Sequence, residues 1–123
     1  RKENSRFLWC FLGYNFLVMD LKELTQQMND LVRHHGWYEL DSPKQQTARN
    51  LAISLSLEAS EVLEHFQWSA ETKDPEGLRG ELADVALYLL QLASVAEIDL
   101  EEAILDKIHA NWDRSWSEKS DQS

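Results

Sequence analysis

The sequence predicts an all-α protein built as an antiparallel four-helix bundle, and three observations lead to this fold class. The chain of 123 residues holds only four Gly and two Pro, which favours long helices over many turns. Apolar residues recur at steps of three and four, and no segment alternates apolar with polar residues as a strand would. The connections between the helical segments are short, which makes consecutive helices antiparallel neighbours. This length fits one domain.

The first two predicted helices follow from apolar spacing and from the residues that begin and end helices. The first carries an apolar stripe that begins at Leu21 and stops near Gly36. The second opens at Ser42 and Pro43, because serine can cap a helix, proline suits the first helical position and Gln45 can close a capping box. It is expected to run to about Trp68.

The last two predicted helices begin at similar signals. Asp74 and Pro75 offer a cap and a first-position proline for the third helix, which is expected to end near Glu97. Asp99 opens a capping box for the fourth helix, which is expected to end near Trp116.

The two ends of the chain differ in composition from this helical region. Residues 1–18 have a basic start followed by an apolar run that is too short for a membrane span and lacks a small-residue cleavage site. They are treated as an N-terminal extension of uncertain origin, and Met19 is a candidate for the natural start. The helical domain is expected to cover residues 19–117, with a flexible tail at residues 118–123.

Charge and cysteine content exclude several classes of protein. A formal net charge of -10 without a Lys/Arg-rich run repels phosphate backbones and disfavours nucleic-acid binding. No segment is long enough to predict a membrane partner. The single cysteine, Cys10, excludes an intrachain disulfide and a cysteine-rich zinc site. These features favour a cytoplasmic setting.

Four acidic residues form the strongest candidate site. Glu58 and Glu61 lie three residues apart in the second predicted helix, as do Glu81 and Asp84 in the third, so each pair projects from one helical face. Two antiparallel helices would bring the four carboxylates together, and their mutual repulsion would require protons or a cation. Mg²⁺, with Mn²⁺ as a substitute, is the expected ion because it takes oxygen ligands and bridges carboxylates to phosphates.

Two other interpretations of these acids remain open or weak. In a non-enzymatic helical adaptor or regulator the four acids would only be solvated side chains, without metal dependence or nucleotide binding. A di-iron bundle would need two Glu-x-x-His elements. The chain offers only Asp106-x-x-His109, so the iron interpretation is poor.

An ordered set of motifs carries a resemblance to a known family. The motifs are Arg49-Asn50-Leu51-Ala52, Glu58-x-x-Glu61, Phe66-Gln67-Trp68, Glu81-x-x-Asp84 with Val85 and Tyr88, and Lys107-x-x-x-Asn111. Over residues 21–116 the chain resembles the MazG-like nucleotide pyrophosphohydrolases, the all-α NTP pyrophosphatase group, in particular its short dCTPase-like members.

The resemblance implies a function and a set of metal ligands. Nucleoside triphosphates would be cleaved between the α- and β-phosphates, with Mg²⁺ held by Glu58, Glu61, Glu81 and Asp84. Glu61 or Glu58 would orient the attacking water as the catalytic base. The implied role is removal of unwanted deoxynucleotides such as dCTP, while relatives acting on dUTP or phosphoribosyl-ATP remain alternatives. The family forms homodimers or homotetramers whose interfaces help to build the substrate pocket.

The resemblance also implies substrate-binding residues, although each has a plain structural explanation. Tryptophans in amphipathic helices usually pack at a core edge, and polar residues at helix starts are common. The candidate substrate-binding residues are Trp68, Trp37, Tyr88, Lys107, Asn111, Arg49 and Asn50.

Overall fold

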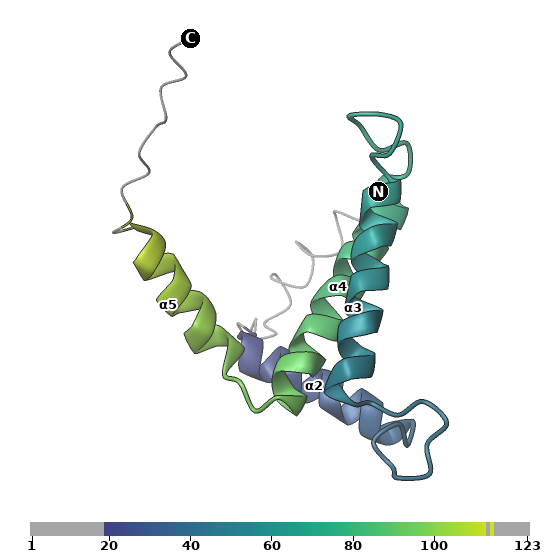
Figure 1. Cartoon of the computed structure of the whole chain (residues 1–123), viewed down its shortest axis with the longest axis vertical. Coiled ribbons are helices and arrows are strands. Elements are labelled where there is room, and N and C mark those ends of the chain that lie inside the picture. The colour runs from purple at the N-terminus through teal and green to yellow at the C-terminus, as the bar shows by residue number, and fades with distance from the viewer. Residues whose placement is uncertain (1–18, 113, 115–123) are drawn as a thin grey trace, which may run out of the picture.

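The computed structural model describes residues 19–112 and 114. This part of the chain contains helices and connecting turns and no strand, so the all-α prediction is confirmed (Figure 1). The helices are α2 (Leu21–His34), α3 (Ala48–Glu64), α4 (Pro75–Val95) and α5 (Leu100–Trp112).

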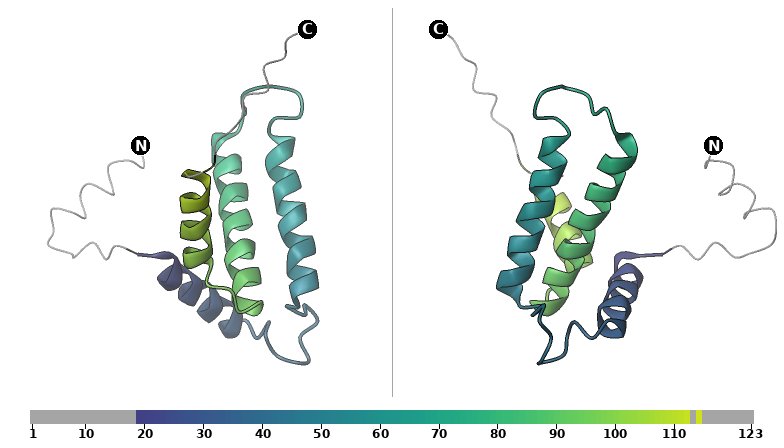
Figure 2. Two further views of the ribbon diagram at one scale, coloured as in Figure 1. Left: turned by 60° about the vertical axis from the view of Figure 1, so that its left-hand side comes forward. Right: turned by 90° about the vertical axis from the view of Figure 1, so that its right-hand side faces the viewer.

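Helices α3 and α4 form an antiparallel hairpin that is the most extensive packing contact in the described chain, and they lie side by side in Figures 1 and 2. The Asp74 side chain accepts a hydrogen bond of 2.9 Å from the Gly77 amide, and Pro75 occupies the first turn, as predicted for the start of this helix. Leu51 is the most deeply buried apolar side chain of α3. This hairpin carries the four acids of the predicted site.

Helix α2 lies across one end of the hairpin and packs on α4 (Figure 1). Met28 and Val32 of α2 form a small buried cluster with Leu90 of α4. Beside it, the Asn29 amide donates to the Ser94 hydroxyl at 3.0 Å. These contacts fix α2 against the second half of α4.

The predicted start of the second helix is wrong by about one and a half turns. Ser42 and Gln45 do not cap the helix, because the Ser42 hydroxyl accepts from the Lys44 amide and the Gln45 side chain donates to the carbonyls of Leu40 and Ser42. The helix begins at Ala48, after the cap Thr47. The chain between α2 and α3 is therefore a long loop, which closes one side of the candidate site.

The predicted end of the same helix, near Trp68, also lies too far along the chain. Helix α3 ends at Glu64 with His65 as its cap, and the His65 ring bonds through Nδ1 to the Thr72 hydroxyl at 2.9 Å. Trp68 consequently belongs to the turn between α3 and α4.

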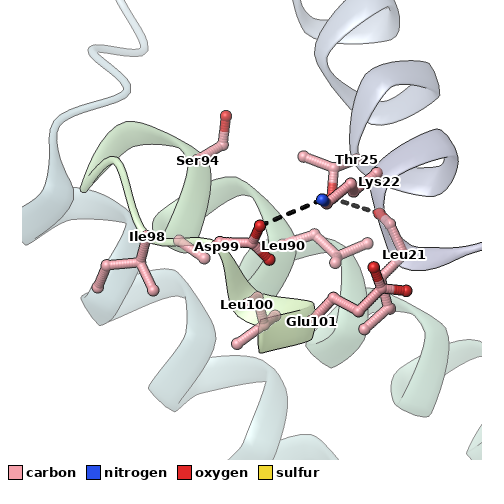
Figure 3. Close-up of a pocket in the computed structure, with 10 residues that line it drawn as sticks. Leu21, Lys22, Thr25, Leu90, Ser94, Ile98, Asp99, Leu100 and Glu101 are labelled. Atoms are coloured by element: carbon pink, nitrogen blue, oxygen red, sulfur yellow. Dashed lines mark hydrogen bonds and ion pairs between the residues drawn. The ribbon is translucent and has the colours of Figure 1, made fainter. Parts of the chain in front are cut away.

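The turn between α4 and α5 has the Schellman geometry. The amide of Ile98 donates to the carbonyl of Ala93 and that of Glu97 to Ser94, with Glu97 in the left-handed region at φ 57°. Asp99 then caps α5 and forms an ion pair of 3.3 Å with Lys22 of α2 (Figure 3). The pocket at this junction, about 210 Å³, is largely apolar.

Helix α5 does not complete the predicted four-helix bundle within one chain. It packs against α2 and points away from the α3–α4 hairpin (Figure 1). Among the described residues only five apolar side chains are buried, which is a small core for a chain of this length. The exposed apolar residues of α5 are Ile104, Leu105, Ile108 and Trp112.

Several predictions concern residues outside the described part of the chain. These are the extension at 1–18, the tail at 118–123 and the predicted helix end at Trp116. Within residues 19–112, no helix has the length and apolar character needed to cross a bilayer.

Candidate functional site

Three of the four predicted acids converge on the α3–α4 hairpin. Glu58 and Glu61 of α3 and Glu81 of α4 each place a carboxylate oxygen within 4.8 Å of the other two. The i,i+3 spacing puts Glu58 and Glu61 on one face, and the antiparallel packing of α4 brings Glu81 opposite them. Glu58 and Glu81 are half-buried, whereas Glu61 is exposed. We call these three residues the acidic cluster.

Two carboxyl groups of the acidic cluster have raised pKa values. Burial, followed by the charge of Glu61, raises the pKa of Glu58 above its ordinary value. Hydrogen bonding with the Glu61 carboxyl, followed by burial, raises the pKa of Glu81. None of the ion pairs found among the described residues includes these three acids.

Asp84 is displaced from the point where the acidic cluster converges. Its side chain is exposed and lies outside the set of oxygens within 4.8 Å. Its charge nevertheless contributes to the raised pKa values of Glu58 and Glu81, so it lies beside them. Asp84 also lines the neighbouring pocket and therefore connects that pocket to the acidic cluster.

The donor chemistry of these acids suits a hard divalent cation. Carboxylate oxygens are the ligands that Mg²⁺ and Mn²⁺ prefer, and the cluster supplies three from two rigid helices. A cation there would relieve the repulsion between these carboxylates, which adds to burial and hydrogen bonding in raising the pKa values of Glu58 and Glu81. Glu58, Glu61 and Glu81, with Asp84 at the edge, thus fit the ion expected from the sequence.

A pocket of about 270 Å³ opens on the Asp84 side, between α2, α4 and the loop that joins α2 to α3. We call it the aromatic pocket. Trp37 stacks on His35 with ring centroids 4.8 Å apart, and the Lys44 ammonium lies 5.5 Å from the Trp37 ring centroid. The lining residues are Met28, Leu31, Val32, Trp37, Lys44, Gln46, Asp84, Leu87, Tyr88 and Gln91.

The structure therefore brings two predicted aromatic residues, Trp37 and Tyr88, into one pocket. Trp37 also packs on the buried cluster of α2 and α4, so its packing role and a ligand-facing role coexist. One apolar pocket next to convergent carboxylates is a typical arrangement for a small-molecule site.

Trp68 lies on the opposite side of the acidic cluster. A depression lined by Glu61, Glu64, His65 and Glu81 continues, through Glu64 and His65, into a second one that includes Trp68. Trp68 is 89% exposed, so within this single chain its ring is not part of an enclosed pocket.

The remaining predicted substrate residues are not assembled with the acidic cluster in one chain. Lys107 and Asn111 are exposed on α5, which points away from the hairpin. Arg49 and Asn50 lie in the first turn of α3, where the Asn50 side chain donates to the Gln45 carbonyl at 3.0 Å. Asn50 thus has a clear structural role in closing the loop.

Sequence reasoning missed two lining residues, Gln46 and Gln91. Gln91 is buried, with an exposed fraction of 5%, and its amide donates to the Gln46 side chain at 2.7 Å. Gln91 follows Tyr88 by three residues on the same stripe of α4, and a polar residue in an apolar stripe was the available signal. Gln46 gave none, because its partner lies 45 positions away.

Comparison with known proteins identifies relatives of this chain. A profile of the MazG-like family matches residues 53–123. Mouse dCTP pyrophosphatase 1 is 33% identical over 103 residues, covering 76% of this chain and 58% of that protein. The human protein of the same name is 34% identical over 100 residues, covering 74% and 56%. The chain thus spans little more than half the length of these relatives.

A solved structure adds the fold. A pyrophosphatase from Archaeoglobus fulgidus superposes with a TM-score of 0.59 at 36% identity, covering 74% of this chain and 87% of that chain. The described chain is all-helical. Its converging carboxylates beside an aromatic pocket form a candidate site for a metal ion and a ligand. The family profile matches more than half of the chain, and the chain belongs to the MazG-like family.

Proposed function

We propose that this chain is a Mg²⁺-dependent nucleoside triphosphate pyrophosphohydrolase, with Mn²⁺ able to substitute. It would convert a nucleoside or deoxynucleoside triphosphate into the monophosphate and pyrophosphate. The observation that carries this proposal is the position of Asp84, which joins three converging carboxylates to an aromatic pocket. Phosphates would lie at the acidic cluster while the base enters the pocket.

The chemistry is assigned to the chain's own carboxylates. Glu58, Glu61, Glu81 and Asp84 would hold the cation, which when bound supplies polarisation of phosphate oxygens. The carboxylate of Glu61 or Glu58 would accept the proton of the attacking water. The water oxygen would form a new bond to the α-phosphorus. The bond from that phosphorus to the oxygen that bridges it to the β-phosphate would break, and pyrophosphate would leave.

The preferred substrate is proposed to be a deoxynucleotide such as dCTP, in a role that clears unwanted nucleotides. The names of the mouse and human relatives support this preference. Alternatives within the same scaffold are dUTP and phosphoribosyl-ATP, and a substrate panel separates them.

The functional form is proposed to be a homodimer or homotetramer. Exposed apolar residues on α3 and α5 would lose contact with water in such an assembly. Lys107 and Asn111 do not reach the acidic cluster within one chain, so a second copy would have to bring them near substrate. Light scattering of the purified protein tests this, and a monomer at micromolar concentration would contradict it.

One product assay tests the activity. The protein is incubated with each common NTP and dNTP and Mg²⁺, and the products are separated by ion-exchange chromatography. Monophosphate with pyrophosphate is the expected result. Diphosphate with phosphate indicates different chemistry, and no turnover or nucleotide binding favours the alternative of a helical adaptor with solvated acids.

A further inference from the structure

The two glutamines of the aromatic pocket form a short hydrogen-bonded relay. Gln46 donates from Nε2 to the backbone carbonyl of Lys44 at 2.7 Å, and its Oε1 accepts from Nε2 of Gln91, also at 2.7 Å. Gln46 belongs to the loop between α2 and α3, whereas Gln91 belongs to α4. The relay therefore ties the orientation of a buried amide to the backbone of the loop.

The backbone carbonyl at Lys44 sets the direction of both amides. A carbonyl oxygen only accepts hydrogen bonds, so Gln46 must present its NH₂ group to it and turn its oxygen toward Gln91. Gln91 must then present its own NH₂ group to Gln46. This argument fixes which atom of each amide is oxygen, an assignment that otherwise rests on the surrounding network.

The relay leaves Oε1 of Gln91 as an acceptor at the pocket. The Tyr38 hydroxyl also interacts with the Gln91 side chain, but it donates its own proton to Asn29. In the described part of the chain no protein donor therefore bonds to this oxygen, and no fully buried side-chain nitrogen or oxygen lacks a partner. The oxygen is therefore not sealed in the core but reachable from the cavity that Gln91 lines. An acceptor at an apolar pocket favours a ligand with an N–H group at that point.

We propose that Gln91 is a specificity-determining residue whose Oε1 accepts a hydrogen bond from the exocyclic amino group of a nucleobase, as in cytosine or adenine. Gln46 is its positioning residue. This inference rests on the proposed function, because it requires a nucleotide base between Trp37 and Tyr88. The pocket of about 270 Å³ suits one base ring, since it is slightly smaller than the roughly 300 Å³ of the smallest drug-sized sites.

A base with a carbonyl at the same position is disfavoured. Its oxygen would face Oε1 of Gln91, acceptor against acceptor, and neither oxygen would gain a hydrogen bond from the other in this largely apolar pocket. Rotation of the Gln91 amide would relieve this conflict, but it would break the bond to Gln46. Discrimination therefore depends on Gln46 as well as on Gln91.

The test compares kcat/KM for dCTP and dUTP, whose bases differ at the exocyclic amino group and the adjacent ring nitrogen. The wild type is expected to prefer dCTP. Gln91→Met should lower that preference about tenfold by removing the acceptor. Gln46→Met should also lower it, but by raising turnover of dUTP, because the Gln91 amide can then rotate.

Gln26→Met on the exposed face of α2 makes the same substitution away from the pocket and should leave the preference unchanged. Circular dichroism and thermal unfolding establish whether each variant is folded. If Gln91→Met does not fold, the effect of Gln46→Met on the ratio of dCTP to dUTP tests the assignment. A ratio of dCTP to dUTP that neither pocket variant changes would overturn the assignment.

The failure of the proposed function is distinguishable from the failure of this inference. If the wild type hydrolyses no nucleotide with Mg²⁺ or Mn²⁺, the proposed activity is wrong. The affinities for dCMP and dUMP, measured by isothermal titration calorimetry, then decide the role of Gln91. Tighter binding of dCMP that Gln91→Met removes supports it, and equal affinity or the absence of binding overturns it.

Discussion

The two halves of one stripe on α4 behave differently. The acidic half, Glu81 and Asp84, is held beside other carboxylates without a counter-charge among the described ion pairs. The pocket half, Tyr88 and Gln91, is one to two turns further on, and Gln91 is bonded to a protein partner. The difference teaches that one helix can carry a segment whose charges have no ion-pair partner in the described chain beside a segment that protein contacts already hold in place.

The largest expected effect is on turnover, through the acidic half. Glu61→Gln keeps the shape of the side chain but removes the negative charge of Glu61, which acts on both Glu58 and Glu81. Loss of a metal ligand should lower kcat more than about a hundredfold, since a bound ion supplies several kcal/mol of transition-state stabilisation. Steady-state kinetics with dCTP measure this, and circular dichroism should show the helical content unchanged.

The matched control for that experiment is Glu102→Gln on α5. It removes the same charge from an exposed site outside the acidic cluster and should retain turnover. If Glu61→Gln keeps wild-type kcat, Glu61 is not a metal ligand and the contrast between the two halves is lost.

The second effect is stabilisation by the ion. Mg²⁺ at a hundred times its Kd should raise the free energy of unfolding by about 2.7 kcal/mol, because it binds the folded chain. Differential scanning fluorimetry at pH 7 measures the accompanying rise in Tm. Glu81→Gln should weaken the rise, and an equal rise in both proteins would place the ion elsewhere.

A third, smaller effect is a loss of stability that does not depend on the ion, and it is expected on the pocket side of the molecule. Asn29 accepts a hydrogen bond from the Tyr38 hydroxyl at 2.6 Å and donates to Ser94. Asn29→Ala should lower the free energy of unfolding by about 1 to 2 kcal/mol, by the same amount with and without Mg²⁺. Urea unfolding measures this, and Gln26→Ala on the same helix is the control. A loss that Mg²⁺ reverses would contradict the distinction between the halves.

The smallest expected effect is the pH dependence of the metal-free protein. The pKa values of Glu58 and Glu81 are raised above the ordinary 4.5, so the folded chain binds more protons and its stability falls as pH rises through the raised values. The change is small because both half-buried groups keep contact with water. Urea unfolding in EDTA at pH 4.5 and pH 7 should show a smaller fall for Glu58→Gln than for the wild type, and an equal fall would contradict the raised pKa.

The sequence predicted the helix starts that depend only on a capping residue and its neighbours within one turn. Asp74 caps α4 and Asp99 caps α5 as expected, since each cap needs only residues within one turn. The start of α3 was wrong because Ser42 and Gln45, which look like a helix cap, bond to loop backbone instead. The same two side chains can either cap a helix or bond to the backbone of a loop, and the sequence pattern alone does not distinguish these two conformations.

The site was predictable to the extent that it follows helical spacing. The convergence of Glu58, Glu61 and Glu81 needs only the i,i+3 rule and an antiparallel hairpin. The displacement of Asp84 depends on the exact rotation of α4, which spacing does not specify. The bond between Gln46 and Gln91 joins a loop to a helix 45 residues away, and no local pattern contains it.

The left-handed turn at Glu97 offers a route to a more heat-resistant protein without touching the site. At the equivalent position after α2 the chain uses Gly36, at φ 67°, whereas Glu97 puts a side chain and a negative charge at the end of α4. Asparagine tolerates this conformation and carries no charge. Glu97→Asn should therefore raise Tm by about 2 to 4 °C, corresponding to about 0.5 kcal/mol, while kcat is retained.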